Sequence, residues 1–445
     1  MSAPEPAAPD GSTTAEDLWP APVAEGPVDA VVTVPGSKSL TNRYLVVAAL
    51  AARDSRLREP LRSRDTELMA RAVHGLGVEV EDAGADWILR PQEVLRGDTD
   101  VDCGLAGTVM RFLPPVAALA GGDVRFDGDP RARERPMADL VGALRDLGVE
   151  VDDGGRGTLP FTVRGRGGLR GGTVVLDASR SSQFVSALLL VGSRCEQGLT
   201  VRHEGPPLPS RPHVQMTVEV LRDVGAVVDD GTEGTWHVEP GELGGLDVQV
   251  EPDLSNAAPF LAAAAVTGGD VLVPGWPQST TQAGDLLRDV LDQMGADVSL
   301  EREGLRVQGT GDLYGLDLDL REAGELAPVV TALAALADSP SQLRGIGHLR
   351  GHETDRLAAL AAEINGLGGD VTETEDGLLV RPRALHGGVF RTYADHRMAT
   401  AAAVLGLRVP GVRVVDVATT RKTLPDFPGM WGSMLTARAS DTTRA

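Results

Sequence analysis

Lysine is nearly absent from this chain of 445 residues. Of its 42 basic residues only Lys38 and Lys422 are lysines, and 64 aspartates and glutamates give a formal net charge of −22 at pH 7. A chain this acidic is not expected to bind nucleic acid or an anionic membrane through its overall field, because electrostatic repulsion opposes both. If the ligand is an anion, the cationic groups that bind it must be concentrated locally.

Cysteines and long apolar runs are also scarce. Cys103 and Cys195 are too few for a disulfide framework and lack the clustering of a zinc site. No apolar run approaches the roughly 18 residues that cross a bilayer. The segment 1–27 is rich in Pro, Ala and Ser and lacks the basic and apolar regions of a signal peptide, which predicts a disordered or loosely packed extension of a cytoplasmic protein.

One helical element recurs along the rest of the chain with a period of about seventy residues. It is an amphipathic helix that ends in a pair such as Leu-Gly and is followed by a strand. A glycine at that place predicts a helix C-cap in the left-handed conformation. These glycines are Gly77, Gly148, Gly225, Gly295 and Gly368.

A second element with the same period is an Ala- and Leu-rich helix that is apolar on nearly every face, which predicts a buried helix. Several strands before these helices alternate polar and apolar residues, so one face of each sheet should meet solvent. The pattern predicts six αβ units in which sheets enclose buried helices; a generic α/β protein with similar helices is the alternative. The six copies begin near residues 38, 106, 181, 254, 325 and 395.

The N-termini of the buried helices should lie together at one end of each group of three units, because each unit's strand runs into the helix start. Each exposed N-terminus carries about half a positive charge and several unpaired N–H groups, which favours phosphate or carboxylate ligands. The starts are densely polar: PGSKSLTNR, GLAGTVMR, SRSSQF, EPDLSNAA, REAGEL and YADHRM.

Ser39 and Ser255 could simply cap these helices. Capping does not explain the cations Lys38, Arg43, Arg111 and Arg397 near helix starts, where the dipole opposes a positive charge and a bound anion would remove the conflict. Further Arg- or His-rich segments are DPRARERPM, PLPSRPHV, GHLRGHETDRL and ATTRKTLPDF.

These motifs, in this order on the sixfold repeat, resemble the family of 5-enolpyruvylshikimate-3-phosphate (EPSP) synthase, or 3-phosphoshikimate 1-carboxyvinyltransferase. The resemblance covers roughly residues 28–430 and rests on PGSKSLTNR, AGTVMR, PRARERP, SSQF, ETDR, DHRMA and RKTLPDF. It implies a two-domain inside-out α/β barrel of six βαβαββ-type repeats. Residues 28–34 and 252–445 would form a discontinuous domain of three repeats, and residues 35–251 an inserted domain of three repeats.

The reaction implied by the resemblance is transfer of the enolpyruvyl group of phosphoenolpyruvate to the 5-hydroxyl of shikimate 3-phosphate, with release of phosphate through a tetrahedral intermediate. This is a step of the shikimate pathway toward chorismate and the aromatic amino acids. No cofactor or metal is implied. A monomer in the cytoplasm, acting on two small molecules without nucleic acid or membrane, is what the family suggests.

The resemblance also implies the site residues. Glu325 would take the hydroxyl proton, and Glu353 with Lys38 would protonate the methylene carbon. The residues expected to bind shikimate 3-phosphate are Lys38, Ser39, Arg43, Ser181, Ser182, Gln183, Ser210, Glu325 and His352. Those expected to bind phosphoenolpyruvate are Lys38, Gly107, Arg135, Gln183, Arg356, Arg397 and Lys422.

Four positions depart from the best-known members of the family. Glu325 replaces the usual aspartate base, and Leu105 replaces an Asn that precedes the AGT motif. His348 stands where the pattern has Asn, and His352 where it often has Lys. Histidine can donate to the hydroxyls of the substrate but its charge depends on pH near neutrality; a purely structural role of His352 is the alternative.

Two other functions are the alternatives. The sister enzyme that transfers enolpyruvyl to UDP-N-acetylglucosamine typically has Asn after the first Lys and a reactive Cys on the loop of the clamp Arg, whereas this chain has Ser39 and no Cys in DPRARERP. A non-catalytic anion-binding relative would have lost the carboxylates of the cleft, but Glu325 and Glu353 are both present.

Overall fold

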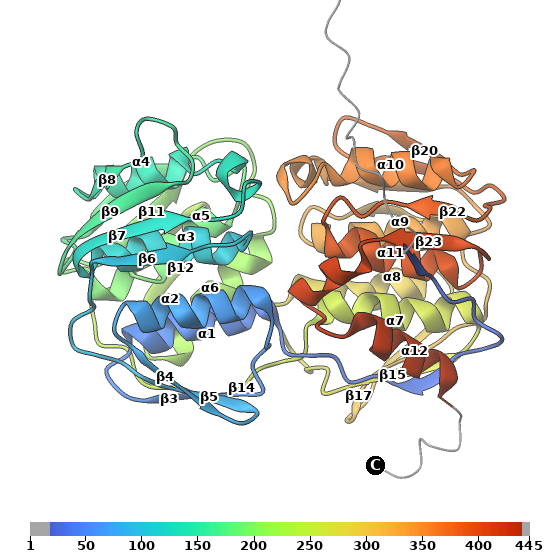
Figure 1. Ribbon diagram of the computed structural model, residues 1–445, viewed down its shortest axis with the longest axis horizontal. Helices are drawn as coiled ribbons and strands as arrows, with labels where there is room; N and C mark the ends of the chain where they lie inside the picture. Colours follow the sequence, from blue (N-terminus) through green and yellow to red (C-terminus); the bar gives the residue numbers. More distant parts are fainter. Residues whose placement is uncertain (1–17, 438–445) are drawn as a thin grey trace, which may run out of the picture.

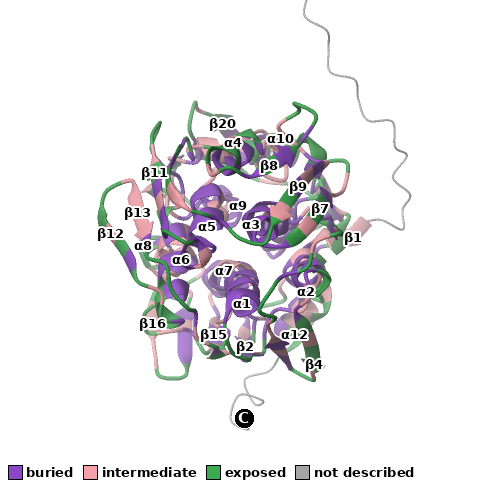
Figure 2. Ribbon diagram, turned by 90° about the vertical axis from the view of Figure 1, so that its left-hand side faces the viewer, coloured by how far each residue is buried: buried purple, intermediate pink, exposed green. Residues whose placement is uncertain are grey.

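The computed structural model describes residues 18–437, which form two halves side by side (Figure 1). Each half contains three helices that are buried along nearly their whole length, and Figure 2 shows them toward the centre with exposed residues around them. The prediction of six buried helices is therefore confirmed. They are α1 (Lys38–Leu50), α3 (Gly107–Ala118) and α5 (Gln183–Leu189) in one half, and α7 (Leu254–Thr267), α9 (Ala327–Leu336) and α11 (His396–Gly406) in the other.

Five amphipathic helices alternate with the buried ones. The glycine two residues beyond each has a φ between +83° and +100°, a region that glycine enters without steric penalty, so all five predicted C-cap glycines are confirmed. These helices are α2 (Arg64–Gly75), α4 (Ala138–Asp146), α6 (Arg211–Asp223), α8 (Leu287–Gln293) and α10 (Arg356–Gly366); α12 (Phe427–Thr436) follows near the end of the described chain. Short 3-10 helices are η2 (Ala132–Glu134), η3 (Gly192–Arg194), η4 (Ala283–Leu286), η5 (Gly324–Leu326), η6 (Gly347–Gly351) and η7 (Val417–Lys422).

Six small sheets surround the helices, and each contains one parallel pair of strands. In four of the sheets the two parallel strands flank one buried helix in sequence. The sheets of the first half are, in strand order, β14 (Asp247–Gln249), β3 (Ser55–Arg58), β5 (Asp86–Arg90), β4 (Glu79–Ala83); β6 (Thr99–Asp102), β7 (Gly121–Asp127), β9 (Phe161–Arg166), β8 (Glu150–Asp152); and β10 (Gly172–Leu176), β11 (Leu199–His203), β13 (Thr235–Val238), β12 (Val228–Thr232). Those of the second half are β16 (Asp297–Leu300), β17 (Gly304–Gln308), β15 (Asp270–Pro274), β2 (Asp29–Val31); β18 (Asp317–Asp319), β19 (Ser341–Arg344), β21 (Leu378–Arg381), β20 (Asp370–Glu373); and β1 (Leu18–Pro20), β23 (Val412–Val415), β22 (Gly388–Phe390).

The predicted α/β class and its inside-out arrangement are confirmed, with two refinements. The six sheets stay separate, so the described residues form no closed barrel. Five units have the full βαβαββ order, as in β6-α3-β7-α4-β8-β9, but the sixth does not. After β22, α11 and β23 the sixth unit continues into η7 and α12, and β1 from the start of the chain completes its sheet.

The chain crosses between the halves twice. β2 precedes α1 but pairs with β15 in the other half, and β14 precedes α7 but pairs with β3. The two crossing segments are hydrogen-bonded to each other: Ser37 N donates to Glu251 O at 2.8 Å, and Asp253 N donates to Pro35 O at 2.9 Å. The halves are therefore joined by two adjacent extended strands that hold each other in register.

Two separate hydrophobic clusters form the interior. One runs from Leu40 to Val250, and the other combines Ala21–Val34 with Leu254–Met434. We propose that these clusters are the cores of the inserted domain, residues 35–251, and of the discontinuous domain, residues 28–34 with 252–445. No helix in the described part of the chain is long and apolar enough to cross a membrane.

The prediction that residues 1–27 form a disordered extension is wrong from Leu18 onward; the residues before it lie outside the described part of the chain. Leu18–Pro20 forms β1, which pairs antiparallel with β23. The ring of Trp19 packs 6.1 Å from the ring of Phe427 in a T-shaped contact, and Ala21 is buried. The composition of the segment did not indicate this strand. A few apolar residues are enough to form a strand where the open edge of a sheet offers backbone hydrogen-bond partners.

Candidate active site

A narrow cavity between the two halves lies at the N-terminal ends of five buried helices: α1, α3, α5, α9 and α11. The gathering of helix N-termini expected from the sequence is thus present. The cavity encloses about 80 Å³. Every predicted site residue except Arg43 lines it: Lys38, Ser39, Gly107, Arg135, Ser181, Ser182, Gln183, Ser210, Glu325, His352, Glu353, Arg356, Arg397 and Lys422.

The cavity wall is strongly cationic although the chain as a whole is acidic. Two carboxylates, Glu325 and Glu353, face seven cationic side chains. The helix N-termini add partial positive charge at the same place. This concentration of positive charge fits ligands that carry several negative charges. The seven cations are Lys38, Arg111, Arg135, Arg180, Arg356, Arg397 and Lys422.

Glu353 is held between two cations. Lys422 donates from Nζ to one carboxylate oxygen, and Arg356 donates from Nη2 to the other at 3.1 Å. Burial alone would raise the pKa of the Glu353 carboxyl, but the charges of Lys422 and then Arg356 outweigh burial and hold the pKa well below its usual range. Burial would likewise lower the pKa of Lys422, yet Glu353 raises it. Glu353 is therefore the internal counterion of Lys422 and Arg356.

Glu325 makes a similar pair on the other side of the cavity. It lies in η5 at the start of α9 and accepts a hydrogen bond from Arg397 at the start of α11. Burial would raise the pKa of Glu325, but the Arg397 charge outweighs it and lowers the pKa. The turn needs the preceding Gly324, since a Cβ there would lie 2.9 Å from Nε2 of His348.

Lys38 begins α1, where its backbone N–H points to Asp253 Oδ2 at 3.3 Å. Its ammonium lies 3.6 Å from the buried carboxylate of Asp65. Burial, followed by the nearby charge of Lys422, lowers the pKa of Lys38. A lysine with a lowered pKa gives up its proton more readily than a solvated one.

Gly107 lies between two polar side chains at the start of α3. A Cβ at this position would lie 3.1 Å from Nη2 of Arg135 and 3.3 Å from Oε1 of Gln183. Gln183 Oε1 also accepts from Arg111 Nη1 at 2.9 Å, which leaves its amide NH₂ free to donate. The absence of a side chain at Gly107 thus lets the guanidinium of Arg135 and the amide group of Gln183 approach the helix N-terminus.

Three serines also line the cavity. Ser181 and Ser182 precede α5, and the Ser181 hydroxyl accepts from Gln183 N at 3.3 Å. Ser210 precedes α6 with a φ of 52°, and its backbone N donates to Arg321 O in the other half at 3.2 Å. No hydrogen bond of the Ser182 or Ser210 hydroxyl to the described residues is present, so both can donate to a ligand.

The histidines of the cavity are neutral at physiological pH. Burial lowers the pKa of His352 well below its usual value and lowers that of His348 to about 4. The expectation that the charge of His352 changes near neutral pH is therefore wrong for the unliganded protein. Its Nδ1 lies 3.5 Å from Arg356 Nη1, and the rings of His348 and His352 meet edge to face with centroids 5.7 Å apart.

Arg43 is the predicted ligand that the structure does not bring to the cavity. Its guanidinium donates to Thr217 Oγ1 at 2.7 Å, to the His213 carbonyl at 2.8 Å and to the Ser39 carbonyl at 3.0 Å. Burial lowers its pKa to about 9. Because its N–H groups donate to acceptors within the protein, Arg43 connects α6 to α1 by hydrogen bonds and does not line the cavity.

Several lining residues were not among the predicted site residues. The sequence contains an indication for two of them. Arg111 is one of the cations near helix starts that capping does not explain, and His213 lies in the Arg- and His-rich segment PLPSRPHV. Asp65, which contacts Lys38 but does not itself line the cavity, had no such indication, because an acidic residue in the first turn of an amphipathic helix is ordinary. The other such lining residues are Thr108, Arg180, Pro209, His348, Leu349, Gly351 and His396.

Comparisons with known proteins agree with this geometry. The family model described as EPSP synthase (3-phosphoshikimate 1-carboxyvinyltransferase) matches residues 23–431. A 3-phosphoshikimate 1-carboxyvinyltransferase of Kocuria rhizophila is 59% identical over 431 residues, which cover 94% of this chain and 97% of that protein. Two structures of EPSP synthase from Acinetobacter baumannii superimpose with TM-scores of 0.80 and 0.78 at 26% and 25% identity. They cover 94% of this chain and 98% and 97% of theirs.

Proposed function

The chain belongs to the EPSP synthase family, and from that premise we propose which residues of the cavity bind each substrate and which move protons. The protein transfers the enolpyruvyl group of phosphoenolpyruvate to shikimate 3-phosphate and releases phosphate, in the shikimate pathway. The observation that carries the assignment of residues is the pairing of the two cavity glutamates, Glu325 and Glu353, with cations that the substrate anions can take over.

Phosphoenolpyruvate binds to the cations around Glu353 in this proposal. Arg135, Arg356, Arg397 and Lys422 grip its phosphate and carboxylate, since guanidinium matches both groups in a bidentate way and ammonium acts as a compact charge. The N-terminus of α3 at Gly107 donates backbone N–H groups to the same ligand. Gln183, oriented by Arg111, donates from its amide between the two substrates.

Shikimate 3-phosphate binds on the side of the serines. Its phosphate is met by Ser181, Ser182 and Ser210, whose hydroxyls lie at the starts of two helices. Its ring hydroxyls and carboxylate are met by Lys38, Ser39, Glu325, Gln183 and the neutral His352. Arg43 can join them only by releasing the Ser39 carbonyl that it now bonds.

Binding of the two substrate anions in the cavity breaks the internal ion pairs of Glu325 and Glu353. When the anions of phosphoenolpyruvate take Lys422 and Arg356, Glu353 loses the charges that hold its pKa down. Burial, which favours the neutral carboxyl, then dominates. Substrate binding thus converts Glu353 from a counterion into a proton donor.

The chemical step follows from this arrangement. Glu353, with Lys38, delivers a proton to the methylene carbon of phosphoenolpyruvate, and the adjacent carbon becomes electrophilic. The 5-hydroxyl oxygen of shikimate 3-phosphate attacks that carbon while its proton passes to Glu325, which gives the tetrahedral intermediate. Loss of a proton from the new methyl group back to the acid–base pair expels phosphate and restores the double bond.

Transferase activity is tested by release of phosphate from phosphoenolpyruvate. Release that depends on shikimate 3-phosphate supports the proposed substrate pair, whereas release that depends on UDP-N-acetylglucosamine contradicts it. We also propose that the protein acts as a cytoplasmic monomer, as membership of the EPSP synthase family suggests. Sedimentation at working concentration tests this: a dimer would contradict it.

A further inference from the structure

The phosphate of shikimate 3-phosphate is the most highly charged group assigned to the side of the cavity where the serines lie. A phosphate monoester carries about −1.5 to −2 charges at pH 7. Ser181, Ser182 and Ser210 can donate hydrogen bonds to it but bring no charge. His352 brings none either, because burial lowers its pKa well below the usual value. These residues therefore leave the phosphate without a counterion.

Six of the seven cationic side chains that line the cavity have a hydrogen-bond or ion-pair partner among the described residues. The seventh, Arg180, forms neither kind of contact with any of them. Arg180 is thus the lining cation that can bind an external anion without giving up an internal partner. The six others pair as follows: Lys38 with Asp65, Arg111 with Gln183, Arg135 with the Leu105 carbonyl, Arg356 and Lys422 with Glu353, and Arg397 with Glu325.

Arg180 lies directly before two of the three serines. A turn at residues 179–180 leads from β10 toward α5, and Arg180, Ser181 and Ser182 all line the same cavity. Arg180 is exposed. Its guanidinium can therefore turn toward a ligand held by the neighbouring serine hydroxyls.

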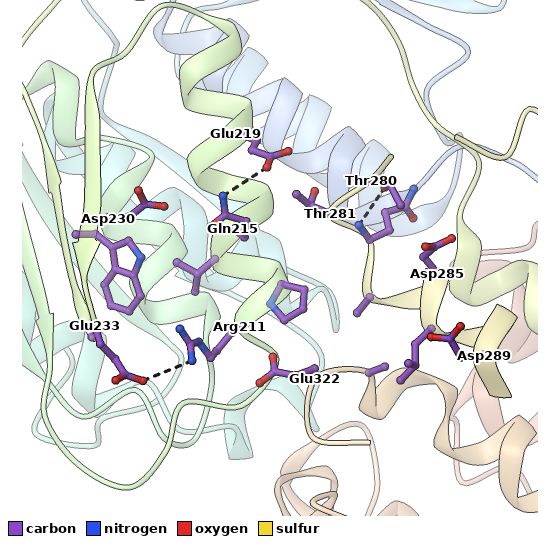
Figure 3. A pocket seen from close by; sticks show the side chains of 18 of the residues that line it. Arg211, Gln215, Glu219, Asp230, Glu233, Thr280, Thr281, Asp285, Asp289 and Glu322 are labelled. Atoms are coloured by element: carbon purple, nitrogen blue, oxygen red, sulfur yellow. Dashed lines mark hydrogen bonds and ion pairs between the residues drawn. The ribbon is translucent and has the colours of Figure 1, made fainter. Parts of the chain in front are cut away.

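Two other arginines lie close to the third serine along the backbone, but neither lines the cavity. Arg211 follows Ser210, and its guanidinium lies 3.5 Å from Glu233 in a separate pocket of about 800 Å³ (Figure 3). Arg321 accepts at its carbonyl from Ser210 N, and its guanidinium lies 3.7 Å from Asp319. Both guanidinium groups are therefore paired outside the active site.

Asp177 is the carboxylate on the same loop as Arg180, and it does not hold the arginine in place. Hydrogen bonds from Ser179 lower the pKa of the Asp177 carboxyl, whereas burial raises it, and the charges of His203 and Arg180 contribute less. Asp177 and Arg180 form no ion pair. A phosphate with nearly two charges is a stronger partner for guanidinium than this solvated carboxylate, because it also accepts two parallel hydrogen bonds.

We propose that Arg180 binds the 3-phosphate of shikimate 3-phosphate and so selects this substrate over shikimate. Guanidinium stays charged throughout the physiological pH range and matches two phosphate oxygens at once. The inference rests on the proposed function, because that function supplies the substrate.

Titration of the full chain with shikimate 3-phosphate by calorimetry tests the proposal, at about 0.15 M salt so that long-range attraction is screened. Arg180→Gln should raise Kd at least about tenfold, the loss typical of a charge-assisted hydrogen bond. Arg180→Lys keeps the charge and should recover most of the affinity. In steady-state kinetics, kcat and KM for phosphoenolpyruvate should stay within about twofold of wild type, because only binding of the other substrate is affected.

The matched control is Arg170→Gln, which removes an exposed arginine of the same half outside the cavity. It should leave the affinity for shikimate 3-phosphate unchanged. Thermal unfolding midpoints verify that each variant folds. Unchanged affinity in Arg180→Gln, or equal losses in Arg180→Gln and in the control, overturns the proposal. Affinity in Arg180→Lys as low as in Arg180→Gln has the same meaning.

Shikimate, which lacks the phosphate, identifies the group that Arg180 contacts. As a competitor of shikimate 3-phosphate, it should bind Arg180→Gln as well as it binds wild type. If Arg180→Gln weakens both ligands equally, Arg180 acts on another part of the substrate and the proposal is wrong. A wild-type protein that does not bind shikimate 3-phosphate contradicts the proposed function itself, and with it this inference.

Discussion

Arg356 donates from Nε to Asp395 Oδ2 at 2.7 Å, and the two side chains are 2% and 0% exposed. The pair joins the first turn of α10 to the N-cap of α11. Nη2 of Arg356 donates both to Asp395 Oδ1 at 3.3 Å and to Glu353 Oε2 at 3.1 Å. Asp395 thus fixes the direction in which Arg356 faces the cavity, although Asp395 itself does not line it.

Asp395→Asn is therefore expected to weaken phosphoenolpyruvate binding. Asparagine can still accept from Arg397 N and cap the helix, but it removes the charge that holds Arg356. Loss of a charge-assisted hydrogen bond costs about 1.5 to 3 kcal/mol, or roughly a tenfold to hundredfold rise in KM. Steady-state kinetics should show this rise for phosphoenolpyruvate, with a smaller effect for shikimate 3-phosphate.

The control is Asp426→Asn, which changes another N-cap aspartate, whose side chain accepts from Gly429 N in α12 away from the cavity. It should leave both KM values unchanged. Equal effects of the two variants would mean that Asp395 acts only as a helix cap.

The two lysines are expected to be irreplaceable by arginine. Guanidinium is bulkier and does not lose its proton in proteins, whereas Lys38 has a lowered pKa and Lys422 contacts Glu353 in a confined space. Lys38→Arg should lower kcat by about 10²- to 10⁴-fold, the usual contribution of a positioned proton donor. Lys422→Arg should mainly raise KM for phosphoenolpyruvate, and each variant should lose most of the activity at low substrate concentration.

Arg53→Lys tests the reverse exchange at an exposed position and should be silent. Near-normal turnover in Lys38→Arg would remove Lys38 from the proton transfer. Normal phosphoenolpyruvate binding in Lys422→Arg would remove the requirement for a compact charge there.

Structural features that depend on residues adjacent in the sequence could be predicted. The five C-cap glycines follow helices whose apolar residues end just before them, and a left-handed residue is needed wherever such a helix turns directly into a strand. The six buried helices could be identified because nearly all their faces are apolar. The predicted site residues came from the order of the motifs, and all of them except Arg43 line the cavity.

Contacts between side chains that are far apart in the sequence could not be predicted in the same way. Glu353 and Lys422 are 69 residues apart, and only the fold places the two side chains together. Asp65 is 2% exposed because α2 packs on α1, which no local pattern reveals. Arg43 stands in a recognisable motif, yet the acceptors that α6 supplies decide where its guanidinium points.

Two histidines near the cavity should make the protein less stable as pH falls from neutrality. Burial lowers the pKa of His213 and that of His348 to about 4, compared with about 6.5 for histidine in the unfolded chain. Between these values the unfolded state binds a proton that the folded state does not. The free energy of unfolding is therefore highest above pH 6.5. As pH falls from 6.5 toward 4 it decreases by about 1.4 kcal/mol per pH unit for each histidine.

His348→Gln should therefore reduce the stability that is lost between pH 7 and pH 5 by about 2 kcal/mol, as measured by urea unfolding at both pH values. His213→Gln should do the same. His74→Gln, at an exposed position of α2, is the control and should leave the loss unchanged. A wild-type stability that is equal at the two pH values would mean that the buried histidines bind protons in the folded state.

Gly107→Ala should impair phosphoenolpyruvate binding without unfolding the protein. The added Cβ would lie 3.1 Å from Arg135 Nη2 and 3.3 Å from Gln183 Oε1. These contacts are tight enough that both side chains must shift by a few tenths of an ångström, and both are proposed ligands. KM for phosphoenolpyruvate should rise severalfold with little change in KM for shikimate 3-phosphate.

Gly142→Ala in α4 has no heavy atom within 4 Å of its new Cβ and should leave both constants unchanged. If Gly107→Ala raises the two KM values equally, the N-terminus of α3 does not distinguish the substrates, and the proposed phosphoenolpyruvate site must be placed elsewhere in the cavity.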